Sequence, residues 1–134
     1  MKKIMIIDDE KSFTRLCKMT LEAVDAYQTI IVNDPLDAIF MISKVKPDLI
    51  FLDVIMPGIN GPDLAAQIRA NASMRDIPII FLSASVVKTG GGKPLVDTGD
   101  GIFRPLQNPL LKELRVLEKP VTPERMIKAI EENT

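Results

Sequence analysis

The stretch that decides the fold of this chain is Leu49-Ile50-Phe51-Leu52-Asp53, followed by the loop Met56-Pro57-Gly58-Ile59-Asn60-Gly61. Four apolar residues in a row end at an acid, without the polar–apolar alternation that a half-exposed strand shows. Uninterrupted apolar strands are typical of parallel sheets that helices cover on both faces. The proline and glycines after the strand predict a tight turn.

Similar runs recur along the chain and predict the rest of the sheet. The further strands are expected at 4–7, 29–32, 79–82 and 116–118. Between them, apolar residues recur at helical spacing. The predicted helices begin at Ser12, at Asp34-Pro35, near Pro62 and at Thr122-Pro123. This alternation of strands and helices predicts an α/β fold with a doubly wound parallel sheet of five strands.

Composition narrows the function before any motif is considered. The 134 residues hold 17 Lys and Arg against 18 Asp and Glu, so the formal net charge is −1. The chain therefore has no excess of positive charge with which to attract nucleic acid or a membrane surface. We expect no direct binding to either. There is no histidine, and Cys17 is the one cysteine, so His-dependent triads and thiolate metal cages are excluded. We expect Cys17 to pack in the core.

The expected compartment follows from the cysteine count and from the start of the chain. A single cysteine fits a reducing compartment. No apolar run approaches the roughly 20 residues that span a bilayer, and the first apolar run turns acidic at Asp8, too early for a signal peptide. We therefore expect a cytoplasmic protein.

Polar residues follow the expected strands at their carboxyl ends. They are Asp8, Asp9, Asp53, Ser83 and Lys119. In an open parallel sheet these ends line one edge, where ligands bind, so three carboxylates, a hydroxyl and an ammonium should converge. Clustered carboxylates repel each other unless a cation neutralises them, and Mg²⁺ prefers oxygen ligands. The alternative is that each acid only ends a strand or caps the next helix.

Together these motifs resemble the response regulator receiver family, the CheY-like domains of two-component signalling. The resemblance covers 3–85 and 116–132 and rests on four motifs in order, which are Asp8-Asp9, the stretch 52–58 with Gly61, Leu82-Ser83-Ala84 and Lys119-Pro120. It implies a single receiver domain over 1–134, with a flavodoxin-like sheet in strand order 2-1-3-4-5. It also implies a sensor histidine kinase or histidine phosphotransfer protein as donor, and a downstream protein that the sequence does not identify.

The resemblance assigns a role to each residue at the strand ends. Asp53 would be the phosphoacceptor, Lys119 would pair with the phosphoryl oxygens, and Ser83 and the backbone amide of Ala84 would donate hydrogen bonds to them. Mg²⁺ would be held by Asp9, Asp53, the backbone carbonyl of Ile55 and, through water, Asp8. The chain would catalyse only its own phosphorylation and dephosphorylation, so it would not be an enzyme in the usual sense.

Two features depart from the family pattern. Val116 stands where the family has an aromatic residue three positions before the lysine. The segment 86–115 holds five of the seven glycines and carries five basic and three acidic residues, a net +2. We expect it to be an atypical insertion that replaces or shortens the fourth helix, as a long mobile loop with at most two helical turns at 108–114. Phosphorylation would then change the order of this segment.

Two other functions remain open on the sequence. A pseudo-receiver would use the same fold as a constitutive protein-interaction module with a vestigial site. A Mg²⁺-dependent hydrolase would act on external phosphoesters. Two local motifs are excluded by their context: the stretch 88–93 lacks the spacing of a nucleotide-binding loop, and Asp97-Thr98-Gly99 lacks the all-β surroundings of an aspartic protease.

Overall fold

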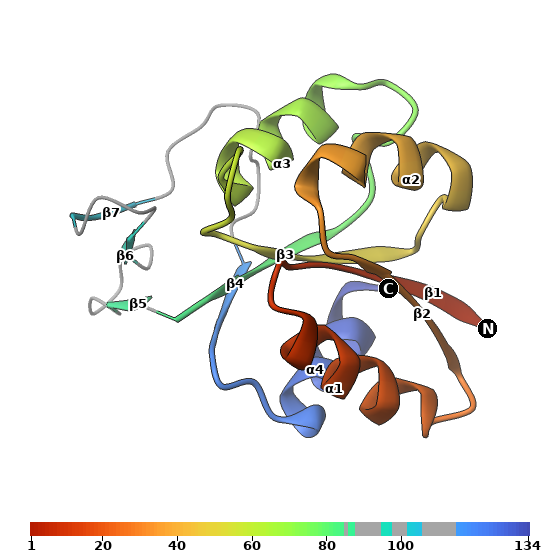
Figure 1. Cartoon of the computed structure of the whole chain (residues 1–134). Coiled ribbons are helices and arrows are strands. Elements are labelled where there is room, and N and C mark those ends of the chain that lie inside the picture. Colours follow the sequence, from red (N-terminus) through yellow and green to blue (C-terminus); the bar gives the residue numbers. More distant parts are fainter. Residues whose placement is uncertain (85, 88–94, 98–101, 106–114) are drawn as a thin grey trace.

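The computed structural model describes residues 1–84, 86–87, 95–97, 102–105 and 115–134 (Figure 1). At its centre lies a five-stranded sheet. Its strands are β1 (Lys2–Ile7), β2 (Tyr27–Val32), β3 (Leu49–Asp53), β4 (Ile79–Ser83) and β8 (Arg115–Glu118). They lie in the order β2-β1-β3-β4-β8, and every pairing is parallel. The predicted flavodoxin-like α/β fold is confirmed, with β8 as the fifth strand of the predicted order.

Helices cover both faces of this sheet, as Figure 1 shows. On one face lie α1 (Lys11–Glu22) and α4 (Pro123–Asn133). On the other lie α2 (Ala38–Val45), which follows the short 3₁₀ helix η1 (Pro35–Asp37), and α3 (Gly61–Ala70). No helix in the described ranges is long and apolar enough to cross a membrane.

A side chain caps the helix at three of the four predicted helix starts. Asp34 accepts a hydrogen bond from the amide of Leu36 at 3.0 Å, and Thr122 caps α4 in the same way. Asn60 caps α3 by accepting from the amide of Asp63 at 2.8 Å. The predicted cap at Ser12 is wrong, because α1 begins one residue earlier and its N-cap residue, Glu10, makes no side-chain cap bond.

The core consists of two apolar layers, one on each face of the sheet. Along β1, Ile4 and Ile6 face α1 and α4, whereas Met5 and Ile7 face α2 and α3, and all four are fully buried. Burial on both faces explains why the strands are apolar without interruption. Cys17 lies in the layer under α1 with 4% of its surface exposed, as expected.

A second, smaller sheet lies in the segment that was expected to be a loop. It consists of β5 (Val86–Val87), β6 (Leu95–Asp97) and β7 (Phe103–Pro105), paired antiparallel in that order. The loop prediction is wrong for these residues. The many glycines of this segment favour a loop, whereas the valines of β5 and β6 favour strands. The helical turns expected at 108–114 fall outside the described residues.

Candidate functional site

The carboxyl ends of the parallel strands form a cleft of about 390 Å³. Asp53 is paired in register with Leu82, and Ser83 with Glu118, so consecutive strands end at one level. The residues that line the cleft are Asp8, Asp9, Glu10, Asp53, Ile55, Ser83, Ala84 and Lys119. All seven residues singled out in the sequence lie in this cleft. Glu10 is an eighth that the sequence analysis did not select, although it directly follows Asp9.

Three carboxylates meet in this cleft. Asp8, Asp9 and Asp53 each offer an oxygen, and these oxygens lie within 4.8 Å of one another. Asp8 is fully buried, and 7% of Asp53 is exposed. Burial and the negative charge of Asp8 raise the pKa of Asp53 to about 7, although Lys119 acts in the opposite direction. Clustered carboxylate oxygens suit a hard divalent cation, so the donor set fits Mg²⁺.

The ammonium of Lys119 reaches into the same cluster. Its Nζ lies 2.6 Å from Oδ2 of Asp8 and 3.5 Å from Oδ1 of Asp53. Burial disfavours the charged ammonium, but its hydrogen bond to Asp8 and the nearby carboxylates outweigh this effect and raise the pKa of Lys119. The ammonium also lies 4.6 Å from the centre of the Phe13 ring, a cation–π contact that fixes its position from the α1 side.

Asp8 is held by one hydrogen bond from the loop that follows it and by another from Asn33. The Oδ1 of Asp8 accepts from the amide of Glu10 at 2.9 Å. Asn33, which follows β2, donates from Nδ2 to the backbone carbonyl of Asp8 at 2.9 Å and to Oγ1 of Thr14 at 3.0 Å. Sequence reasoning missed Asn33. Its position after β2 matches that of Asp8 after β1, which is the pattern that could have identified it.

The backbone around Asp53 is fixed by two hydrogen bonds and by a glycine. Val54 donates from its amide to the carbonyl of Leu82 at 3.0 Å, and Gly61 donates to the carbonyl of Val54 at 2.8 Å. A Cβ atom on Gly61 would clash with the carbonyl oxygen of Asp53. Only glycine permits this close approach.

The far side of the cleft is formed by β4 and the residues after β8. Ser83 is 2% exposed, and its carbonyl accepts a hydrogen bond from the amide of Lys119 at 2.8 Å. Ala84 follows in the lining, and Ile55 lies at the rim with 46% of its surface exposed. The arrangement can therefore surround a small anionic group with a cation, an ammonium and a hydroxyl. The individual roles stay predictions.

The chain matches a known family over most of its length. Residues 4–93 match the response regulator receiver domain, and this span is more than half of the chain. The chain belongs to the response regulator receiver family. The predicted resemblance is thus confirmed, and it places the chain in two-component signalling.

Relatives of this receiver differ in how much of their length it covers. PilG of Pseudomonas aeruginosa is 29% identical over 128 residues, which are 96% of this chain and 84% of PilG. The DNA-binding response regulator MtrA of Mycobacterium tuberculosis is 29% identical over 83 residues, which are 62% of this chain and 35% of MtrA. The match with MtrA therefore spans about a third of that relative.

Solved structures share the fold of this receiver. The chemotaxis protein CheY4 of Vibrio cholerae has a TM-score of 0.76 at 20% identity, covering 100% of this chain and 99% of CheY4. The receiver domain of a signal transduction histidine kinase from Syntrophus aciditrophicus has a TM-score of 0.72 at 22% identity, covering 98% and 89% of the two chains. At this level of identity the likeness concerns the fold alone.

Proposed function

We propose that this receiver is a phosphorylatable switch, in which Asp53 accepts a phosphoryl group from a phosphohistidine in a Mg²⁺-dependent reaction. The donor is a sensor histidine kinase or a histidine phosphotransfer protein, and the phosphorylated state changes the binding of a downstream protein. One observation carries the proposal. Three carboxylates and an ammonium from separate strand ends meet in a single cleft, with a nearly buried Asp53 among them.

The proposed transfer is a displacement at phosphorus. A carboxylate oxygen of Asp53 attacks the phosphorus atom, and the bond from phosphorus to the imidazole nitrogen of the donor breaks. The electron pair stays on that nitrogen, which takes up a proton from solvent. Attack requires the ionised carboxylate, so the neighbouring cationic charge must offset the raised pKa of Asp53. In the reverse direction of the switch, water attacks the same phosphorus atom, and inorganic phosphate leaves Asp53 as a carboxylate.

The residues around Asp53 supply positioning and charge, which are the main needs of phosphoryl transfer. Lys119, whose Nζ is 3.5 Å from Oδ1 of Asp53, is placed to pair with a phosphoryl oxygen. The Ser83 hydroxyl and the Ala84 amide donate hydrogen bonds to the others. Mg²⁺ would be held by the carboxylates of Asp9 and Asp53, by the carbonyl of Ile55 and, through water, by Asp8. When bound, it neutralises negative charge and polarises the phosphoryl oxygens.

The remaining proposals follow from the class of protein. The receiver acts on its own Asp53 only, so it is not an enzyme in the usual sense. We place it in the cytoplasm, because a single cysteine fits a reducing compartment. The near-neutral charge supports a protein as its output partner and no direct binding to nucleic acid.

Intact-mass spectrometry after incubation with acetyl phosphate and Mg²⁺ tests this function. We expect one phosphoryl adduct on the wild-type chain and none on Asp53→Asn. Asp25→Asn is the matched control, because Asp25 is an exposed acid before β2, at the opposite edge of the sheet. Absence of an adduct with acetyl phosphate and with phosphoramidate would support the pseudo-receiver instead. Turnover of p-nitrophenyl phosphate would support a hydrolase.

A further inference from the structure

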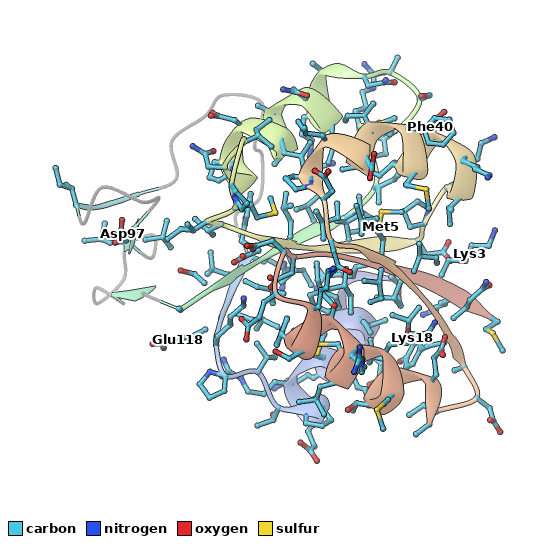
Figure 2. All side chains as sticks on the ribbon, viewed as in Figure 1. Lys3, Met5, Lys18, Phe40, Asp97 and Glu118 are labelled. Atoms are coloured by element: carbon cyan, nitrogen blue, oxygen red, sulfur yellow. The ribbon has the colours of Figure 1, made fainter. Side chains whose placement is uncertain are left out.

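Helix α2 carries large apolar side chains on its outer face. Phe40 is 67% exposed, and Leu36, in the preceding η1, is 76% exposed. Figure 2 shows Phe40 on the outer side of α2, pointing away from the sheet. The inner face of the same helix packs against the sheet, and its Ala38 and Ile42 are buried in the core. A helix that is apolar on both its faces is typical of one that is covered on both.

Charges of opposite sign flank this apolar face. Phe40 is the middle residue of the segment 35–45 that η1 and α2 form. Asp37 lies three positions before it, and Lys44 lies four positions after it. Both are exposed, and neither forms an ion pair with the rest of the described chain. They cannot pair with each other, because seven residues separate them by about 10 Å along a helix.

A pocket lies beside the carboxyl-terminal half of α2. It has a volume of about 380 Å³ and is lined by Ile42, Ser43, Lys46, Pro47, Ser73, Met74 and Ile77. Leu36, Phe40 and Ser43 follow one another at helical spacing of four and three, so they form a single stripe. That stripe leads from the exposed Leu36 to the mouth of the pocket.

We propose that this stripe is a homodimer interface, in which the α2 helices of two copies pack antiparallel about a two-fold axis at Phe40. The antiparallel arrangement sets Asp37 of each copy opposite Lys44 of the other. It also places Leu36, about 6 Å from the axis, at the level of Ser43 and Lys44 in the second copy, beside the pocket. Both apolar side chains are then covered, and both charges gain a partner.

The order of charges selects a second copy over other occupants. Along the helix the stripe runs from acidic through apolar to basic, and reversing its direction gives its own complement, as a two-fold interface requires. A partner helix with charge of one sign would be repelled at one end. The face is one short helix, so the dimer belongs among weak, concentration-dependent interfaces.

Sedimentation velocity of the full chain over a concentration series tests the interface. We expect the wild type to shift from monomer toward dimer as concentration rises, and Phe40→Gln to remain monomeric at the same concentrations. Met19→Gln is the matched control, because Met19 is 68% exposed on α1, on the opposite face of the sheet. It should dimerise as the wild type does. A wild type that stays monomeric throughout, or a dimer unaffected by Phe40→Gln, overturns the proposal.

Charge reversal tests the antiparallel geometry separately. Asp37→Lys and Lys44→Asp, each alone, set like charges opposite each other twice per dimer and should weaken association at least about tenfold. An equimolar mixture of the two variants restores both ion pairs, so it should form a heterodimer at least as readily as the wild type dimerises. Thermal melts of each variant verify folding. A mixture that associates no better than the separate variants overturns the geometry.

Discussion

The two sheets of this receiver differ in how they are tied to the core. In the parallel sheet every residue of β3 and β4 is buried, whereas the edge strand β8 is partly exposed. Among the described side chains of the antiparallel sheet, Val96 alone lies in a core cluster. The cleft is built on the first sheet, and the family match ends at residue 93, before β6 begins. Asp8, Asp53 and Ser83 of the cleft thus rest on the parallel sheet. Of the two departures from the family pattern, the segment 86–115 holds the small sheet, and Val116 lies in the edge strand β8.

The largest effect should come from the parallel sheet itself. Phe51 lies in the central strand β3 and is fully buried, so Phe51→Ala should lower the free energy of unfolding by about 3–5 kcal/mol. Urea denaturation followed by circular dichroism measures this loss. A loss below that of Val96→Ala would break the contrast between the two sheets.

The next effect concerns Asp53 in metal-free protein. Its pKa is about 7 in the folded chain against 3.8 ordinarily, so between these values the folded state keeps a proton that the unfolded state has released. Stability is therefore full below about pH 4 and falls as pH rises toward 7, by a few kcal/mol at most. Asp53→Asn should flatten this slope in urea titrations at several pH values.

Magnesium should act on the same slope without any substitution. Because a bound cation offsets the carboxylate repulsion, Mg²⁺ should raise the melting temperature of the wild type near pH 7 by several degrees. The rise should be smaller in Asp53→Asn, which has lost one of the three carboxylates. An equal rise in both proteins would place the cation effect outside the cleft.

A smaller loss is expected in the antiparallel sheet. Val96→Ala removes about two methylene equivalents from a site with 1% exposure, so the free energy of unfolding should fall by about 2 kcal/mol. Acetyl phosphate should still label Asp53, because the cleft rests on the other sheet. If Val96→Ala abolished labelling, the two sheets would be coupled in the chemistry.

The subtlest effect is the response of the small sheet to the phosphorylated state. Ser83 and Ala84 line the cleft and directly precede this sheet, and Val116 lies where the family has an aromatic ring. Beryllofluoride with Mg²⁺ should therefore alter amide hydrogen exchange in β5, β6 and β7. Unchanged exchange in these strands, with protection gained at Ser83, would contradict transmission through this segment.

The sequence predicted the parallel sheet and the cleft for the same physical reason. Strands buried on both faces must be apolar throughout, so a polar residue that ends such a run is conspicuous, as Asp53 is after Leu52. Contacts between separate elements have no comparable signal in the sequence. Asn33 and Phe13 reach Asp8 and Lys119 only because of how the strands and α1 pack together. In the small sheet, short strands gave too few residues for a periodic pattern.

The parallel pairing of β4 with β8 has a practical consequence for engineering. Ser83 ends β4 at the level of Glu118, whereas β8 begins at Arg115, which is paired with Ile80. The chain therefore leaves the sheet beside the cleft and re-enters it at the other end of the strands. A reporter domain that replaces the intervening residues needs, on one side, a linker long enough to run the length of β8, about 10 Å.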